Sequence, residues 1–353
     1  MGKTDDREVI AEIYDLTLDE LGAWFAENGQ PGYRAKQVFK WLHDRLASSF
    51  DEMTDLPATL REALAEAFRM GPLEPITVSK AEDSTKLLLG LADGETVECV
   101  RMVTDEKVAS LCVSSQVGCV IRCSFCASGS KGLVRNLTAG EIVSQAVTLR
   151  AKVGAARNIV FMGMGEPMLN LDAVLKALEI LTDKAGWGIS PQRITVSTSG
   201  IANGIRRYAQ AGLDTELALS LNAPTDQLRR KLMPGIRDTL ADVLAACDEF
   251  TEARGGKPVT YTYVLLAGVN DQPEHASQVV ELLKGRRHHV NLIAYNPVPG
   301  AKWKAPPYQH MDAFAVRLHK GGLKVTRRRS KGQSINAACG QLRAQQASSR
   351  GGR

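Results

Sequence analysis

The sequence predicts an α/β fold, a partial (β/α)6 barrel preceded by a small helical accessory domain and a β-hairpin. Apolar residues recur at helical spacing over residues 1–75, and they alternate with polar residues over 86–103. From Ala109 onward, short apolar segments alternate with helical runs, which is typical of a parallel sheet. Strands are expected near 108–114, 157–162, 193–198, 215–221, 259–266, 289–294 and 323–327. These give about six repeats, fewer than the eight of a closed barrel.

Local signals support these elements. Thr17 with Glu20, and Thr138 with Glu141, have the spacing of helix capping boxes. A second amphipathic run begins at Gly32, and a third covers residues 55–70. We expect a helical accessory domain over 1–75, a β-hairpin connector over 76–105 turning at Asp93, and the barrel with a C-terminal catalytic segment over 106–343. The Ala-, Ser-, Gly- and Arg-rich residues 344–353 are expected to be a flexible tail.

Composition indicates a cytoplasmic protein that does not enter a membrane. No apolar run approaches the ~20 residues of a transmembrane helix, and the charged first ten residues do not resemble a secretory signal. The net charge is +5, with basic residues in three groups. The groups are Lys284, Arg286, Arg287, His288 and His289; Arg327, Arg328, Arg329 and Lys331; and Arg206, Arg207, Arg229, Arg230 and Lys231. Such groups suit RNA phosphates, but solvated helix faces are an equal alternative.

The cysteines indicate a metal centre. Seven cysteines in a cytoplasmic chain are not expected to form a disulfide framework. Cys119, Cys123 and Cys126 follow the first barrel strand, and three thiolates on one loop can bind three irons of a [4Fe–4S] cluster while leaving the fourth iron open. A structural zinc site is the alternative, but such sites usually have four ligands. No histidine or second Cys-x2-Cys is near enough in sequence to complete one.

The cysteine spacing is similar to that of radical S-adenosylmethionine (SAM) enzymes, and further motifs resemble one family of them, the RlmN methyltransferases. Those motifs are YRAKQ (33–37), SFDEM (49–53), LCVSSQVGC (111–119), FMGMGEP (161–167), STSG (197–200), LMP (232–234), GVND (268–271) and AACGQL (337–342). The resemblance covers nearly the whole chain. It implies methylation of adenine C2 in 23S rRNA, tRNA or both, using two SAM molecules per turnover. An electron donor such as flavodoxin or ferredoxin would be needed, and the chain is expected to be a monomer.

The resemblance also implies roles for particular residues. Cys339 would take a methyl group from one SAM, and radical cleavage of a second SAM would activate that carbon for addition to adenine. Glu98 would remove the C2 proton, with Glu95 as the nearby alternative. Cys112 would then attack the Cys339 sulfur, releasing the product and leaving a transient disulfide. The expected SAM contacts are Gly165, Glu166, Ser197, Ser220, Leu221, Asn222 and Asn296. Cys99 and Cys247 are expected to be inert core residues.

The sequence also departs from the family pattern. The family has His where this chain has Asn222, and acidic residues near Ser334 and Asn336. Methylation of adenine C8, as in the Cfr branch, therefore stays open, although Pro167 favours the C2 branch. A non-enzymatic RNA-binding module stabilised by a metal ion is the alternative from another class.

Overall fold

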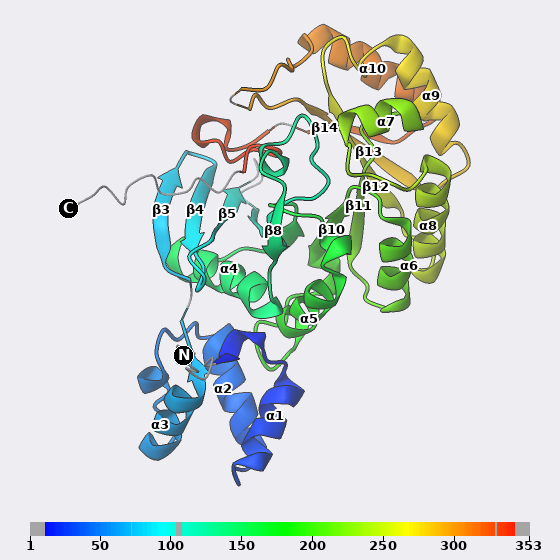
Figure 1. Ribbon diagram of the computed structural model, residues 1–353. Helices are drawn as coiled ribbons and strands as arrows, with labels where there is room; N and C mark the ends of the chain where they lie inside the picture. Colours follow the sequence, from blue (N-terminus) through cyan, green and yellow to red (C-terminus); the bar gives the residue numbers. More distant parts are fainter. Residues whose placement is uncertain (1–10, 72, 104–107, 299, 329, 343–353) are drawn as a thin grey trace, which may run out of the picture.

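A central sheet of ten strands organises the molecule (Figure 1). The computed structural model describes residues 11–71, 73–103, 108–298, 300–328 and 330–342. The strands lie in the order β14-β13-β12-β11-β10-β9-β6-β5-β4-β3. The expected tail, 344–353, and the first ten residues lie outside the described part. Within that part, no helix is long and apolar enough to cross a membrane.

The parallel half of the sheet confirms the predicted strands. Its members are β6 (Ala109–Cys112), β9 (Asn158–Phe161), β10 (Ile194–Thr198), β11 (Glu216–Ser220), β12 (Val259–Leu265), β13 (His288–Ala294) and β14 (Val325–Arg328). Each pairs in parallel with its neighbour. The connecting helices are α4 (Ala139–Lys152), α5 (Leu171–Thr182), α6 (Ala202–Gln210), α7 (Asp226–Leu232), α8 (Leu240–Ala253), α9 (Pro273–Leu283) and α10 (Tyr308–Lys320). The carboxyl ends of the parallel strands therefore share one edge of the sheet.

The predicted hairpin is present and belongs to the same sheet. Strand β4 (Ser84–Gly90) pairs with β5 (Thr96–Val103), and β5 continues the sheet by pairing antiparallel with β6, with Val100 opposite Cys112. A third strand, β3 (Pro75–Lys80), forms the outer edge. The sequence did not predict β3, because most of its side chains are exposed and it begins with a proline, which an edge strand tolerates.

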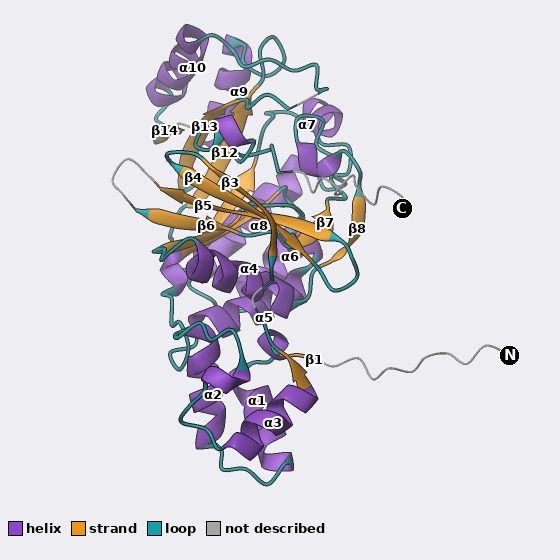
Figure 2. Cartoon of the chain, turned by 90° about the vertical axis from the view of Figure 1, so that its left-hand side faces the viewer, coloured by secondary structure: helices purple, strands orange, loops and turns teal. Residues whose placement is uncertain are grey.

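The N-terminal helices lie at one end of the molecule, next to α4 and α5 (Figures 1 and 2). They are α1 (Leu18–Glu27), α2 (Tyr33–His43) and α3 (Ala58–Ala67). A two-stranded sheet of β1 (Ala11–Glu12) and β2 (Phe68–Arg69) closes this region; strands of this length leave no periodicity to detect. Short 3-10 helices are η1 (Ile13–Asp15), η2 (Phe50–Glu52), η3 (Ala127–Gly129), η4 (Pro167–Leu169), η5 (Pro191–Arg193) and η6 (Gln333–Ile335). Both predicted capping boxes are confirmed.

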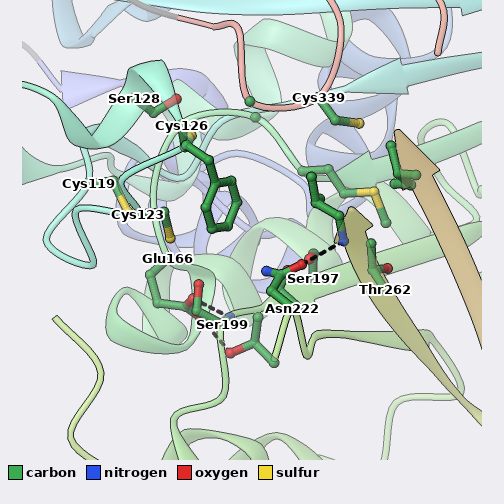
Figure 3. Close-up of a pocket in the computed structure, with 18 of the residues that line it drawn as sticks. Cys119, Cys123, Cys126, Ser128, Glu166, Ser197, Ser199, Asn222, Thr262 and Cys339 are labelled. Atoms are coloured by element: carbon green, nitrogen blue, oxygen red, sulfur yellow. Dashed lines mark hydrogen bonds between the residues drawn. The ribbon is translucent and has the colours of Figure 1, made fainter. Parts of the chain in front are cut away.

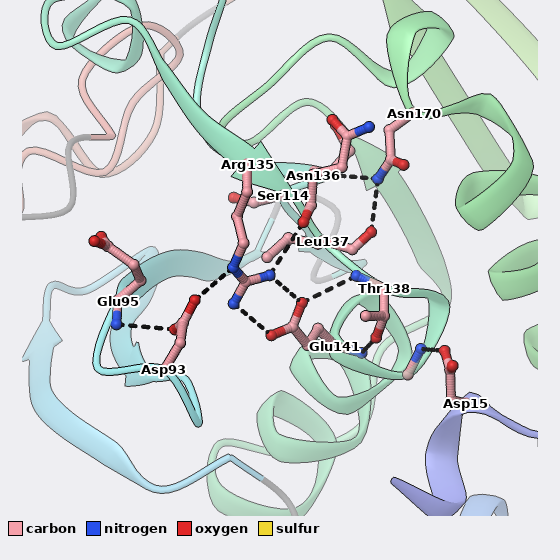
Figure 4. Close-up of polar contacts among 12 residues, drawn as sticks. Asp15, Asp93, Glu95, Ser114, Arg135, Asn136, Leu137, Thr138, Glu141 and Asn170 are labelled. Atoms are coloured by element: carbon pink, nitrogen blue, oxygen red, sulfur yellow. Dashed lines mark hydrogen bonds and ion pairs between the residues drawn. The ribbon is translucent and has the colours of Figure 1, made fainter. Parts of the chain in front are cut away.

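The start of α4 joins the N-terminal region and the hairpin to the barrel. The Gly140 amide donates to Asp15 Oδ1 at 2.6 Å. Arg135 lies on β8 (Leu133–Asn136), which pairs with β7 (Gln116–Gly118). Its guanidinium binds both carboxylate oxygens of Glu141 at 2.8 Å, and reaches Asp93 in the hairpin turn at 2.6 Å (Figure 4). One bidentate arginine thus fixes the hairpin against the helix that follows the first barrel strand.

Gly140→Ala tests this junction. A Cβ at this position would lie 2.8 Å from the Asp15 backbone nitrogen, so the N-terminal region must shift. We expect the free energy of unfolding to fall by roughly 1–3 kcal/mol, measured by chemical denaturation. Gly22→Ala on α1 is the control, because nothing lies within 4 Å of its added methyl group. It should stabilise the protein by roughly 0.5–1 kcal/mol. Equal stability of the two variants would contradict the described packing.

Candidate active site

A cavity opens at the carboxyl edge of the parallel strands, and most of the predicted site residues line it (Figure 3). Those residues are Cys119, Cys123, Cys126, Gly165, Glu166, Ser197, Ser220, Asn222, Asn296 and Cys339. They lie in or directly after five strands, β7, β9, β10, β11 and β13, and in the C-terminal segment. The sheet therefore brings together side chains that are far apart in the sequence.

The cysteine loop is held in a tight conformation. Arg122, between the first two cysteines, has a left-handed backbone with φ of 54°, which is uncommon for a residue with a side chain. The Ser124 amide donates to the Leu232 carbonyl at 2.8 Å, and the Trp303 indole donates to the Ser124 carbonyl at 2.8 Å. Gly129 packs against the loop so closely that a Cβ would lie 2.7 Å from Arg122 Cα. The three thiols are thus fixed by the backbone around them.

Burial governs the protonation of the three thiols on this loop. Burial raises the pKa of Cys119 to about 12, and burial is also the largest cause of the raised pKa values of Cys123 and Cys126. Such thiols stay protonated unless a metal replaces the proton. Within the described ranges, no three Cys, His, Asp or Glu side chains are grouped to hold one metal ion.

Glu166 is the most strongly constrained polar group of the cavity. Only 1% exposed, it accepts hydrogen bonds from Thr198 Oγ1 at 2.7 Å, from the Met168 amide at 3.1 Å and from the Ser199 amide at 2.6 Å (Figure 3). Burial nevertheless raises its pKa. Gly165 has φ of 106°, and a Cβ there would lie 2.7 Å from the Gln116 amide. A buried carboxylate in this setting favours a cationic ligand.

The remaining strand-end residues differ in whether they line the cavity and whether they also bind the backbone around it. Ser197 and Ser220 present hydroxyl groups to the cavity, whereas Leu221 is fully buried in the core and does not line it. Asn222, with φ of 55°, uses its side-chain oxygen to accept from the Val264 amide at 3.0 Å. Asn296 donates to the Cys339 carbonyl at 3.0 Å. The two asparagines therefore shape the cavity as well as line it.

Cys339 reaches the cavity because the C-terminal segment folds back beside the cysteine loop. The Ala127 amide donates to the Gly340 carbonyl at 2.7 Å, and Ser128 Oγ donates to the Leu342 carbonyl at 2.7 Å. Cys339 is exposed, and it lies across the cavity from the cysteine loop (Figure 3). Cys112 is 6% exposed at the end of β6. Burial raises its pKa to about 12, and the next cause is the Cys339 thiol, which lies near it.

Glu98 lines a second cavity, and residues of the C-terminal segment line both this cavity and the first. Its carboxylate is 2.8 Å from Lys86 Nζ, and Lys86 also donates to the Asn336 carbonyl at 3.2 Å. The backbone carbonyl of Glu98 accepts a hydrogen bond from Ser114 Oγ at 2.7 Å. The same Ser114 hydroxyl accepts from the Met164 amide at 2.8 Å. Glu98 is thus linked both to the segment that precedes Cys339 and to the glycine-rich loop that precedes Glu166.

The sequence did not identify several of these residues. Lys86 and Glu98 lie on the same face of the hairpin, as a diagonal pair, because Lys86 is opposite Val100 and Glu98 is opposite Leu88. The register implied by the turn at Asp93 could have revealed this pair. Ser114 lies inside the LCVSSQVGC motif and could have been inferred from it. By contrast, Glu95 lines a separate hollow near the hairpin turn.

The basic groups do not form one surface. Arg206, Arg207, Arg286 and Arg327 form ion pairs with Glu249, Asp172, Asp248 and Asp312, respectively. The expectation that Arg229 belongs to a basic surface is wrong, because Arg229 is 1% exposed and lies inside the barrel wall. Arg329 lies outside the described residues. Arg328 lines the cavity, and Arg230 and Lys231 are exposed.

Comparisons with known proteins agree with this geometry. A model of the radical SAM superfamily matches residues 113–280, and a model of the ribosomal RNA large subunit methyltransferase N-terminal domain matches residues 11–70. A probable dual-specificity RNA methyltransferase RlmN from Rhodopirellula baltica is 47% identical over 94% of this chain and 90% of its own length. The chain belongs to the RlmN family. The RlmN enzyme of Halorhodospira halophila is 44% identical over 94% of this chain and 93% of its own length.

A solved structure extends the RlmN match to three dimensions. The crystal structure of a radical SAM methyltransferase from Sphaerobacter thermophilus superimposes with a TM-score of 0.91, at 42% identity, and covers 95% of this chain and 100% of that chain. The predicted α/β radical SAM fold with an N-terminal helical domain is thereby confirmed, as is a radical SAM RNA methyltransferase of the RlmN family.

Lys86→Met tests the link between Glu98 and the C-terminal segment. Loss of a charged donor to two acceptors should lower the free energy of unfolding by roughly 1.5–3 kcal/mol and speed hydrogen exchange over residues 330–342. Lys86→Arg should preserve most of the protection. Lys80→Met, on the exposed edge strand, is the control and should leave exchange unchanged. Equal exchange in Lys86→Met and wild-type protein would show that Lys86 does not hold this segment.

Proposed function

We propose that this protein transfers a methyl group from SAM, by way of Cys339, to C2 of adenine in 23S rRNA, tRNA or both. The observation that supports this most directly is that Cys339 and the three cysteines of the loop line one cavity. The exposed Cys339 and the three-cysteine loop line the same cavity, and the buried Cys112 is at the end of β6, where the Cys339 thiol contributes to its raised pKa. A carrier, a resolving thiol and a cluster loop are the parts that this chemistry requires.

Two cofactors complete the site. Cys119, Cys123 and Cys126 would hold a [4Fe–4S] cluster, and the open side of the cavity would hold SAM. The cluster with SAM supplies reductive, radical chemistry to a carbon that polar methyl transfer does not reach. Glu166 would accept hydrogen bonds from the ammonium group of SAM, which compensates the burial of its carboxylate. Gly165, Ser197, Ser220, Asn222 and Asn296 would form the rest of the SAM site, with Leu221 packed behind them in the core.

Three residues of the protein would each carry out one step of the reaction. Cys339 accepts the methyl group as a thioether, so the transferred carbon is attached to the protein before it reaches RNA. Glu98 removes the C2 proton after the carbon has joined the base. Cys112 attacks the Cys339 sulfur as a thiolate: an S–S bond forms, and the bond between that sulfur and the transferred carbon breaks. The carbon keeps the electron pair of the broken bond and takes up a proton, which releases the methylated base, and an external thiol then reduces the disulfide. Because burial raises the pKa of Cys112, this last step should be faster at higher pH.

The partners follow from the same proposal. The 1–75 region would bind RNA, the 76–105 hairpin would connect it to the catalytic unit over 106–343, and 344–353 would form the tail. Relatives named dual-specificity RNA methyltransferases support an RNA substrate. Exposed Arg230 and Lys231, together with Arg328 at the cavity, would contact phosphates. We further propose a cytoplasmic monomer that receives electrons from a flavodoxin or ferredoxin.

Cys112→Ala tests the proposed function. Without the resolving thiol, the adenine should stay linked to Cys339 through the transferred carbon. Denaturing electrophoresis of Cys112→Ala protein with its RNA should therefore show a covalent complex, absent from Cys112→Ala/Cys339→Ala. Cys247→Ala is the matched control, because Cys247 is also buried but lies on α8 outside the cavity. Full methylation by Cys112→Ala without a covalent complex would remove Cys112 from the mechanism.

Glu98→Gln tests the base. The amide keeps the size of the side chain but cannot take up a proton, so methylation should fall by about 10²–10⁴-fold. Iron content and SAM binding should stay normal. Glu95→Gln, at the hairpin turn, should retain wild-type turnover. The reverse result would assign the base to Glu95.

A further inference from the structure

Arg229 is a buried cation whose hydrogen bonds are largely unfilled. The residue lies on α7 with 1% of its surface exposed. Its Nη2 donates to the Ser199 carbonyl, but Nε and Nη1 have no hydrogen-bond partner among the described residues. Guanidinium groups inside proteins are normally paired, because removing a charge from water without a partner is strongly unfavourable. Burial accordingly lowers the pKa of Arg229.

Arg229 lies on the helix that contacts the cysteine loop, and it also reaches the segment that binds Glu166. The carboxyl end of α7 binds the cysteine loop, since the Leu232 carbonyl accepts from the Ser124 amide at 2.8 Å. On its other side, Arg229 contacts Ser199, whose amide binds Glu166 at 2.6 Å. Gly200, with φ of 94°, leaves room for the guanidinium, because a Cβ there would lie 2.8 Å from Nη2.

We propose that Arg229 is the internal counter-charge of the iron–sulfur centre and a positioning residue that sets its reduction potential. This inference rests on the proposed function, because it requires a cluster on Cys119, Cys123 and Cys126. Three thiolates outweigh the positive charge of the cluster core, so the centre is anionic and gains further negative charge on reduction. A nearby cation buried in the protein stabilises the reduced form more than the oxidised form. Arg229 therefore raises the potential and eases reduction.

The charge of Arg229 lowers the stability of the folded protein when the cluster is absent. The cysteines are then neutral thiols, and Arg229 keeps the unfavourable energy of a buried, poorly partnered cation. Loading the cluster supplies the missing negative charge. Part of the stability gained on loading should thus come from Arg229. A purely structural role, holding the Ser199 carbonyl, would instead stabilise the metal-free and the loaded protein alike.

A second buried arginine provides a matched control. Arg254 follows α8, and 4% of its side chain is exposed; its Nε and Nη1 likewise have no partner in the described part of the chain. Its Nη2 pairs with Asp214 at 2.7 Å and Glu216 at 3.2 Å. Glu216 begins β11, so this arginine lies at the amino edge of the sheet, opposite the cysteine loop. Its loss should affect stability but not the cluster.

The experiment is a potentiometric titration of the reconstituted cluster, followed by electron paramagnetic resonance, without SAM or RNA. We expect the midpoint potential of Arg229→Met to be more negative than that of wild type, while Arg229→Lys stays close to wild type and Arg254→Met is unchanged. An unchanged potential in Arg229→Met, with wild-type iron content, would overturn the inference and leave the proposed function intact. Wild-type protein that takes up zinc, and no iron or sulfide, would overturn both.

Thermal unfolding gives a second readout that does not depend on turnover. Metal-free Arg229→Met should melt at or above the wild-type temperature, and the increase on loading the cluster should be smaller than in wild type. A drop that is equal in the metal-free and loaded forms would assign Arg229 a structural role and overturn the inference. If Arg229→Met does not fold, Arg229→Gln compared with Arg229→Lys makes the same test.

Discussion

The return of the C-terminal segment onto the cysteine loop is the constraint on which the site depends. Two backbone-directed hydrogen bonds, from Ala127 to Gly340 and from Ser128 to Leu342, hold the segment beside the loop. Asn296 fixes it from the other side through the Cys339 carbonyl. The first two of these bonds join residues more than two hundred positions apart in the sequence. Without them, Cys339 would not be held at the cavity that the three-cysteine loop lines.

Close packing at the sheet edge gives the cavity its shape. Gly165 lies against Gln116, and Gly163 lies so near Ser114 that a Cβ would be 2.5 Å from its hydroxyl oxygen. Ser114 in turn joins the Glu98 strand to the loop before Glu166. The hairpin is therefore joined directly to the barrel that forms the cavity, because β5 continues the barrel sheet through β6. Backbone contacts of this kind leave little freedom for the side chains that face the substrate.

Much of the fold and site could be predicted from local sequence. Apolar segments and capping residues located the parallel strands and helices, because these signals act within a few residues. The cysteine spacing and Glu166 were also visible in motifs. Lys86 was missed because its pairing with Glu98 depends on hairpin register. Arg229 was assigned to a basic surface because its neighbours Arg230 and Lys231 are exposed, and only the packing of α7 shows that it faces inward. Leu221 does not line the cavity, since its side chain points into the core.

The central claim, that the transferred carbon travels on Cys339 and loses a hydrogen there, has one direct measurement. The protein, freed of any methyl group already on Cys339, is supplied with SAM whose methyl group carries three deuterium atoms. The number of deuterium atoms in methyladenosine from the digested RNA is then measured by mass spectrometry. Our account predicts C2-methyladenosine that retains two deuterium atoms, because one is removed while the carbon is attached to the thiol. Product that retains all three would mean direct transfer from SAM to RNA and would contradict the account.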